Sequence, residues 1–258
     1  MKRVIKIGGR AQTDAALPEV IAFAVRGGSA LCVVHGGGDE VSALQRRLGL
    51  EPQFLGGRRV TSEADLTVVR MVLSGATNKR LVAQLISAGV RAVGVSGEDG
   101  GLFRAQVTDA RMGRVGGAVS VDGTLVDVLL SAGFVPVVSP LARDANDPAG
   151  GGLNVNGDDA AAALAVAIGA DDLVLVADVP GVLDGSATIA SLDLDGARAL
   201  VARGVATGGM TAKLDAAAAA VLGGVANVRI AGIAGISDMN AGTRITNVSS
   251  TVRGRASE

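Results

Sequence analysis

Six short apolar runs rich in β-branched residues recur along the 258-residue chain, and longer stretches of helical pattern separate them. Runs that are apolar on both faces are typical of strands in a parallel sheet that helices cover on each side. We therefore predict an α/β fold with a parallel central sheet. The predicted strands are Val4–Ile7, Leu31–Val34, Val90–Val95, Phe134–Val138, Leu173–Ala177 and Val228–Ala231.

The intervening segments and one glycine-rich stretch complete the expected organisation. Residues 102–125 hold short alternating segments with Gly and Asp-Gly turn signals, which favour a β-hairpin. A Gly/Pro/Asp/Asn stretch, Arg143–Gly152, separates two halves that each have their own strands. We place an N-terminal lobe at 1–150, a C-terminal lobe at 151–248 and a polar tail at 249–258. The predicted helices are Ala15–Arg26, Glu40–Leu48, Glu63–Ser87, Asp159–Ile168, Leu194–Ala202 and Met210–Leu222.

The composition argues against several classes of partner. The formal net charge is −1, so there is no basic excess to hold a nucleic-acid backbone. Aromatic residues make up 2%, without Trp or Tyr, so base-stacking platforms are missing too. No apolar stretch reaches membrane-spanning length, and the first apolar run is too short for a signal peptide. One cysteine, Cys32, and one histidine, His35, exclude a disulfide and His-pair or zinc-cluster sites. We predict a cytoplasmic enzyme or binding protein without nucleic-acid, membrane or protein-held metal partners.

Two predicted strands run directly into glycine clusters, Gly8-Gly9 and Gly36-Gly37-Gly38. Glycines at a strand end allow backbone N–H groups to approach phosphate or carboxylate oxygens, and the next helix adds its positive end. A tight strand–helix turn would explain either cluster alone, but two in one chain favour anion binding. Neither cluster is a Walker A sequence or a full dinucleotide fingerprint.

Two lysines stand where local rules disfavour them. Lys6 lies inside an apolar strand, and a buried lysine is costly unless it is paired or belongs to a site. An edge strand from which Lys6 reaches water is the alternative. Lys213 falls in the predicted first turn of a helix after Thr207-Gly208-Gly209, where a cation opposes the helix dipole. An anionic ligand would reverse that cost, whereas an exposed, tolerated lysine is the alternative.

A polar corner precedes the helix that begins near Asp158 and Asp159. Acidic residues in a first turn are ordinary helix caps. Asn154 and Asn156 add two amide side chains at the same corner, and these can either bind a ligand or cap the helix.

Two adjacent arginines, Arg58 and Arg59, follow Gly56-Gly57. A guanidinium is the natural bidentate partner of a carboxylate, and a solvated pair is the alternative. We interpret Cys32 as a packing residue. His35 is expected to orient the neighbouring glycine loop rather than to titrate.

An ordered set of segments resembles the N-acetylglutamate kinase family of the amino-acid kinase superfamily, from about Val4 to Ile245. The segments are KIGG, HGGG, GRRVT, NVNGDDAA, ADVPGVLD, GGMTAK and GTRI. Each is a weak signal alone, whereas their order and spacing are specific. The resemblance implies a three-layer αβα sandwich, the amino-acid kinase fold, in which the N-terminal lobe binds the acyl amino acid and the C-terminal lobe binds ATP.

The resemblance also implies roles for individual residues. Lys6 and Lys213 are the implied transition-state lysines, and Asp158 positions them. The implied acyl amino-acid site is Gly37, Gly38, Arg59 and Asn154. The implied nucleotide site is Gly8, Gly9, Asp178, Val179, Pro180, Gly181, Val182, Leu183, Thr207, Gly208, Gly209 and Met210. Gly157 and Ala177 depart from the family pattern, which usually has Ala and a hydroxyl residue there.

The implied reaction moves the γ-phosphoryl group of ATP, bound with Mg²⁺ mainly through its phosphates, onto the γ-carboxylate of N-acetyl-L-glutamate in arginine and ornithine biosynthesis. Two alternatives stay open: a kinase for acyl-aminoadipate or another acylglutamate, and a non-catalytic ligand-binding or regulatory protein on the same fold. Within Glu63–Ser87 an apolar stripe, together with the resemblance, predicts a homodimer. The stripe is Leu66, Val69, Val72, Leu73, Leu81 and Leu85.

Overall fold

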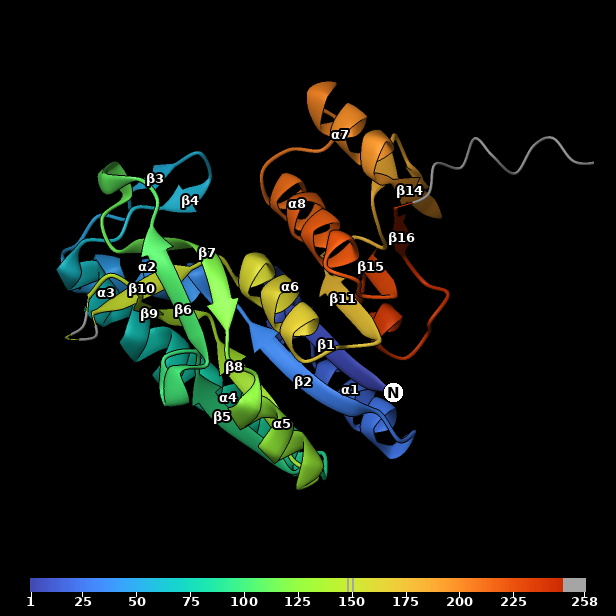
Figure 1. Cartoon of the computed structure of the whole chain (residues 1–258), viewed down its shortest axis with the longest axis horizontal. Helices are drawn as coiled ribbons and strands as arrows, with labels where there is room; N and C mark the ends of the chain where they lie inside the picture. Colours follow the sequence, from blue (N-terminus) through green and yellow to red (C-terminus); the bar gives the residue numbers. More distant parts are fainter. Residues whose placement is uncertain (148, 150, 248–258) are drawn as a thin grey trace, which may run out of the picture.

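A computed structural model describes residues 1–147, 149 and 151–247, and its centre is one eight-stranded sheet (Figure 1). Neighbouring described strands of this sheet are parallel, except that β15 and β16 pair antiparallel. The predicted mainly parallel sheet is therefore confirmed. The strand order is β14 (Ser191–Asp193), β16 (Thr243–Thr246), β15 (Asn227–Ala231), β11 (Asp172–Val176), β1 (Lys2–Ile7), β2 (Ala30–His35), β8 (Val135–Ser139) and β5 (Ala92–Ser96).

Smaller β elements lie around this sheet. A closed four-stranded barrel joins β10 (Gly152–Val155), β7 (Val115–Val121), β6 (Phe103–Val107) and β9 (Leu141–Asp144). Two hairpins pair β3 (Phe54–Leu55) with β4 (Arg58–Arg59), and β12 (Leu183–Asp184) with β13 (Ala187–Thr188).

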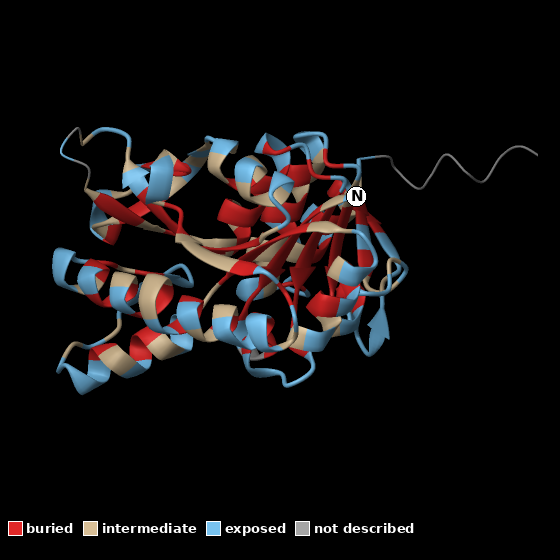
Figure 2. Ribbon diagram, turned by 90° about the horizontal axis from the view of Figure 1, so that it is seen from below, coloured by how far each residue is buried: buried red, intermediate tan, exposed pale blue. Residues whose placement is uncertain are grey.

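Helices cover both faces of the sheet, and the strands of the sheet consist largely of buried residues (Figure 2). One face packs against α1 (Leu17–Arg26) and α4 (Asn78–Ser87). The other packs against α5 (Thr124–Ser131), α6 (Gly157–Ala167), α7 (Leu194–Ala202) and α8 (Gly209–Leu222). The remaining helical segments are α2 (Gly38–Arg47), α3 (Glu63–Arg70), the π-helix η2 (Met71–Thr77) and the 3₁₀ turns η1 (Gly9–Thr13), η3 (Asp99–Gly101), η4 (Ala110–Met112) and η5 (Ile233–Ile236).

Strand β1 occupies the middle of the sheet, between β2 and β11. Successive side chains of a strand point to opposite faces, so Ile5 and Ile7 enter the core beside α1 and α4, whereas Val4 enters the core beside α6. Lys6 therefore faces α6. Because β1 is interior, the edge-strand explanation of Lys6 is wrong. The chain leaves β1 toward one side of the sheet and reaches β11 on the other, and ligands of open α/β sheets bind at such switch points.

Every predicted strand and helix is present, with shifts of a few residues at the ends. The segment 102–125 does contain an antiparallel pair, β6 and β7. The predicted turn residues are wrong, however, because Gly116 and Gly117 lie inside β7 and the connection between the two strands runs through η4. Asp122 and Gly123 lead into α5, a helix that the sequence did not predict. The predicted polar tail 249–258 lies outside the described residues.

The glycine-rich stretch Arg143–Gly152 connects β9 to β10, whose first antiparallel pair is Arg143 with Gly152. Strands from before and after this stretch meet in one continuous sheet, because β1 pairs with β11. The stretch is thus a connection within the barrel, and the division into an amino-acid lobe and a nucleotide lobe stays a prediction about function.

The predicted stripe of Glu63–Ser87 is buried within its own chain. All six apolar residues are at most 5% exposed. They pack in the cores beside α2 and α1, so they are not available to a symmetry mate. The π-helical turn η2 explains why one face stays buried across Gly75, since it shifts the helical register by a residue.

A buried ionic triad ties the far end of the sheet together. The Asp172 carboxylate on β11 lies 2.9 Å from Arg3 Nη2 on β1 and 3.2 Å from Arg229 Nη2 on β15. Arg229 also donates to the backbone carbonyl oxygens of Asp238 and Ala241. All three side chains of the triad are almost fully buried. Removing one of them would therefore leave a buried charge without its counter-ion.

Replacing the shared carboxylate should destabilise the fold strongly. Asp172→Ala leaves two buried guanidinium groups without their counter-ion, a change that typically costs about 3–5 kcal/mol. The matched control is Asp171→Ala, one residue earlier and exposed, which loses only the hydrogen bond from Lys2 N and should cost about 1 kcal/mol. Urea unfolding of both variants measures the free energies of unfolding. Equal small losses would contradict the structural role given to the triad.

Candidate active site

Three predicted residues from three distant elements meet at one buried carboxylate. Lys6 Nζ on β1 lies 3.0 Å from Asp158 Oδ1. Lys213 Nζ on α8 lies 3.2 Å from Asp158 Oδ1 and 3.3 Å from Oδ2. The three elements lie side by side in the middle of the molecule (Figure 1). One carboxylate thus holds two ammonium groups, and the trio keeps one positive charge in excess.

The start of α6 leaves Asp158 free for this task. Asn156 is the helix cap, and its Oδ1 accepts hydrogen bonds from the N–H groups of Asp158 at 2.8 Å and Asp159 at 3.2 Å. The cap therefore does not need Asp158, and the plain capping explanation of that residue is wrong. Lys213 is the fifth residue of α8, so it sits in the second helical turn rather than in the predicted first.

Two glycines leave room for the Lys6 side chain. A Cβ at Gly8 would stand 2.5 Å from Lys6 Nζ, and one at Gly157 would stand 3.2 Å from Lys6 Cε. Any larger residue at Gly8 would push the ammonium group, since real Cβ atoms do not approach that closely. The absence of a side chain at Gly8 and Gly157 thus leaves the space that the Lys6 side chain occupies.

The electrostatics of the trio follow from burial and charge. Burial acts to raise the pKa of Asp158, but Lys6 and Lys213 outweigh it and hold that pKa below its ordinary value. The pKa of Lys213 is lowered, first by burial and then by the charge of Lys6, against the opposing effect of Asp158. The carboxylate is therefore firmly ionised.

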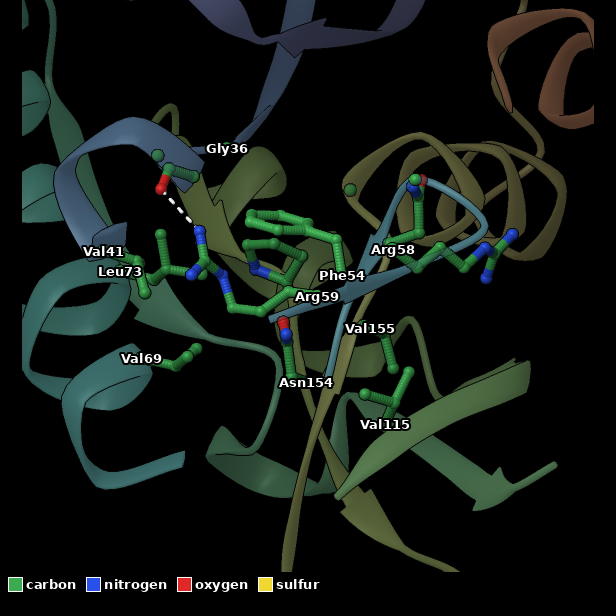
Figure 3. Close-up of a pocket in the computed structure, with 16 residues that line it drawn as sticks. Gly36, Val41, Phe54, Arg58, Arg59, Val69, Leu73, Val115, Asn154 and Val155 are labelled. Carbon is green, nitrogen blue, oxygen red and sulfur yellow. Dashed lines mark hydrogen bonds between the residues drawn. The ribbon is translucent and has the colours of Figure 1, made fainter. Parts of the chain in front are cut away.

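Figure 3 shows a cavity of about 240 Å³ between the glycine loop after β2, the β3–β4 hairpin and the start of α6. All four residues predicted for the acyl amino-acid site line it: Gly37, Gly38, Arg59 and Asn154. Asn156 and Gly157 also line it, which places the cavity next to the first turn of α6 and hence next to Asp158. Asn154 Nδ2 donates to Thr61 Oγ1 at 3.1 Å.

The Arg59 guanidinium is held by Gly38 and by two residues that the sequence did not single out, Ser42 and Gln45. Its Nη2 donates to the Gly38 carbonyl oxygen and to Ser42 Oγ, both at 2.7 Å, and its Nη1 donates to Gln45 Oε1. The ring of Phe54 lies 4.9 Å from its central carbon. Burial lowers the pKa of Arg59, although a guanidinium stays charged at any working pH. The result is a fixed positive fork in the wall of the cavity.

The glycine loop after β2 is shaped by its neighbours. Gly37 has φ +146°, and a Cβ there would stand 2.7 Å from Leu73 Cδ2 on η2. His35 Nδ1 lies 2.8 Å from the Gly36 carbonyl oxygen, and Asn78 Nδ2 lies 3.1 Å from His35 Nε2. Burial lowers the pKa of His35 to about 4, so the ring is neutral near pH 7. These contacts agree with the expectation that His35 orients the loop.

The first turn of α8 has the features of an anion site. Thr207, Gly208 and Gly209 are exposed, and Met210 is half-buried. Gly208 is the helix cap with φ +54°, and among the described residues no side chain caps its N–H groups. A Cβ at Gly208 or Gly209 would meet no described atom within 4 Å. Met210 N donates to the Thr207 carbonyl oxygen at 3.1 Å, so not every N–H group of this turn is free, but an open helix start without a side-chain cap suits a phosphate.

The other predicted nucleotide segment follows β11. Thr243 Oγ1 accepts from Val182 N at 2.8 Å and donates to the Ile189 carbonyl oxygen at 2.6 Å, so it anchors this loop. Gly9 has φ +55°, and a Cβ there would stand 2.9 Å from Asp178 Oδ2, which brings the first glycine loop beside this segment. Asp178, Val179 and Pro180 line a cavity of about 300 Å³, whereas Gly181 and Val182 are buried and Leu183 begins β12.

Within residues 1–147, 149 and 151–247, no three His, Cys, Asp or Glu side chains come together as a metal site. No described helix is long and apolar enough to cross a membrane.

Lys6 on β1, Lys213 on α8 and the glycine loops after β1 and β2 lie at the carboxyl end of the parallel sheet, an arrangement that suits anionic ligands. The amino acid kinase family model matches residues 1–232, and the chain belongs to this family.

Several relatives are similar over most of the chain. The acetylglutamate kinase of Chloroflexus aurantiacus (strain ATCC 29366 / DSM 635 / J-10-fl) is 42% identical over 248 residues, 95% of this chain and 96% of the relative. That of Methanopyrus kandleri is 46% identical over 215 residues, 79% of this chain and 86% of the relative. The solved structure of smu.665 from Streptococcus mutans UA159 superposes with a TM-score of 0.86 at 29% identity, covering 96% of this chain and 99% of that one.

The charges around Asp158 predict how Lys213 titrates. Lys213 should lose its proton below the ordinary lysine pKa. Lys6→Met removes a neighbouring positive charge and should raise the Lys213 pKa, whereas Asp158→Asn removes a negative one and should lower it. NMR titration of the lysine Cε–Nζ signals measures both shifts. Shifts of the opposite sign, or none, would contradict the shared-carboxylate geometry.

Proposed function

We propose that this chain is an acetylglutamate kinase, which transfers the γ-phosphoryl group of ATP to the γ-carboxylate of N-acetyl-L-glutamate and forms an acyl phosphate. The observation that carries the proposal is the pair of lysines on Asp158, directly beside the cavity that contains Arg59 and Asn154. Relatives of that name, similar over most of their length, support it. The product would enter arginine biosynthesis.

The proposed residues act by position and charge. The acceptor carboxylate is already ionised at neutral pH, so the reaction needs no general base, and neutral His35 is not required as one. Phosphoryl transfer depends mainly on alignment and on stabilising the charge of the transferring group. Lys6 would stabilise the transferring phosphoryl oxygens, and Lys213 the oxygen between the β- and γ-phosphorus atoms. Asp158 would keep both ammonium groups fixed by charge-assisted hydrogen bonds.

The two ends of the reaction would be held by different walls. Arg59 would bind the α-carboxylate of the acyl amino acid, with Asn154 and the N–H groups of Gly37 and Gly38 beside it, so that the γ-carboxylate faces the lysines. Gly8 and Gly9, the loop after β11 and the first turn of α8 would hold the nucleotide. Mg²⁺ would come with the nucleotide, bound to its phosphates, and would neutralise charge there.

The test offers two acceptors to the enzyme with ATP and Mg²⁺. A coupled assay follows ADP, and hydroxylamine traps the acyl phosphate as a hydroxamate. We expect turnover with N-acetyl-L-glutamate and little with N-acetyl-aminoadipate, and reactions without acceptor give the background hydrolysis. A preference for the longer acid would identify an acyl-aminoadipate kinase. No hydroxamate with any acyl amino acid would favour a non-catalytic binding protein.

Arg59→Ala should weaken acyl amino-acid binding selectively. Loss of a charged hydrogen-bond partner should raise KM for N-acetylglutamate at least about tenfold, with a much smaller effect on KM for ATP. Arg47→Ala, an exposed arginine at the end of α2, is the matched control. An unchanged acyl amino-acid KM in a folded Arg59→Ala variant would move the carboxylate site elsewhere.

We also propose that the enzyme is a cytoplasmic homodimer. Since the apolar stripe of α3, η2 and α4 is buried in its own chain, an interface would use the outward face of the same segment, where Met71 on η2 and Ile86 on α4 are more than half exposed. An isologous contact of this kind closes as a dimer.

A further inference from the structure

One ion pair joins the β3–β4 hairpin to the helix that carries Asp158. Arg58 Nη2 lies 3.0 Å from Asp159 Oδ2, and the two residues are 101 positions apart in the sequence. Arg58 is the neighbour of Arg59 on β4, and Asp159 is the neighbour of Asp158 on α6. The pair therefore connects the two segments that supply Arg59 and the shared carboxylate.

The hairpin has few other supports at its tip. A Cβ at Gly56 or Gly57 would meet no described atom within 4 Å, and Phe54 and Leu55 are 57% and 43% exposed. Each strand of the hairpin has only two residues. Such a short, exposed hairpin is marginally stable by itself, so contacts from its side chains to the body of the protein fix its position.

The side chains of Arg58 and Arg59 hold the hairpin from two different directions. They point to opposite sides of the hairpin (Figure 3). Arg59 reaches Gly38 and Ser42 at the glycine loop and α2, whereas Arg58 reaches Asp159 at α6. The hairpin, of which Phe54, Gly57, Arg58 and Arg59 line the cavity, is thus tied in two directions.

The partner of Arg58 is separate from the lysine cluster. Consecutive residues of a helix project about 100° apart, so Asp158 faces the lysines while Asp159 faces the hairpin. Asp159 also lines a second cavity, of about 490 Å³, between β7, α6 and α8. The alternative drawn from the sequence, a solvated Arg58, does not account for this contact.

We propose that Arg58 and Asp159 are positioning residues, whose ion pair holds the β3–β4 hairpin, and with it Arg59, in the geometry that binds the acyl amino acid. The proposal rests on the proposed function for its substrate. The pair contacts neither the lysines nor the nucleotide segments in any described interaction. Its loss should therefore act on acyl amino-acid binding.

A double-mutant cycle tests the tie, that is, the Arg58–Asp159 ion pair that holds the β3–β4 hairpin on α6. Arg58→Met and Asp159→Asn should each raise KM for N-acetylglutamate about two- to fivefold, the range expected for a partly exposed ion pair, with smaller changes in kcat and in KM for ATP. The double variant should be no worse than either single one, because both remove the same contact. Arg58→Lys should recover part of the loss. Arg198→Met, which breaks an exposed Arg–Asp pair on α7, should change nothing.

The cycle also separates the tie from simple charge compensation. If Arg58 only neutralised Asp159 near an anionic substrate, Asp159→Asn would be harmless and would rescue Arg58→Met, and that result would overturn the proposal. Additive effects or an unchanged acyl amino-acid KM would overturn it as well.

A readout without turnover keeps this inference distinct from the proposed function. Hydrogen exchange of residues 54–59 should be faster in Arg58→Met and Asp159→Asn than in the wild-type protein and the Arg198→Met control. If the wild-type protein does not phosphorylate N-acetylglutamate but this difference is present, the proposed function fails and the tie stands. If turnover is normal and the hairpin exchanges equally in all four proteins, the tie is wrong.

Discussion

The buried carboxylate of Asp158, shared by the ammonium groups of Lys6 and Lys213, is the contact on which the rest of the site depends. Removing three charges from water is costly unless each has a close partner. One carboxylate cannot neutralise two cations, so the trio keeps an excess positive charge in a largely buried place. A phosphoryl group in transfer is the kind of anion that would complete this arrangement.

The fold places these groups from elements far apart in the chain. The interior strand β1 places Lys6 at the carboxyl end of the sheet. On one side of β1 lies β2, from the first half of the chain, and on the other lies β11, from the second half. Alternation along β1 turns Lys6 toward α6, and Asn156 caps α6 so that Asp158 is available. The Asp172 triad stabilises β1, β11 and β15 near the opposite end of the sheet. Stability and chemistry thus use different ends of the same strands.

The apolar runs predicted the parallel sheet. The sequence also singled out Lys6 as a site residue, because a lysine inside an apolar strand is costly unless it is paired or belongs to a site. It did not predict Ser42 and Gln45, which hold Arg59, because ordinary polar residues on a helix carry no such signal. The helix α5 was missed because its eight residues follow an Asp-Gly pair that reads as a turn, and the role of the Glu63–Ser87 stripe was misjudged because periodicity shows that a face is buried but not what covers it. The Arg58–Asp159 contact joins residues 101 positions apart, and only the folded chain brings them together.

The kcat of Asp158→Asn, measured beside Asp159→Asn, tests the central claim most directly. Both substitutions exchange a carboxylate for an amide of the same shape at adjacent residues, and a thermal melt confirms that each variant is folded. The account predicts that Asp158→Asn lowers kcat by about 10²–10³-fold, the usual loss when a preorganised charge arrangement is disrupted, whereas Asp159→Asn changes it little. A folded Asp158→Asn enzyme with near-wild-type kcat would contradict the claim that one shared carboxylate organises the site.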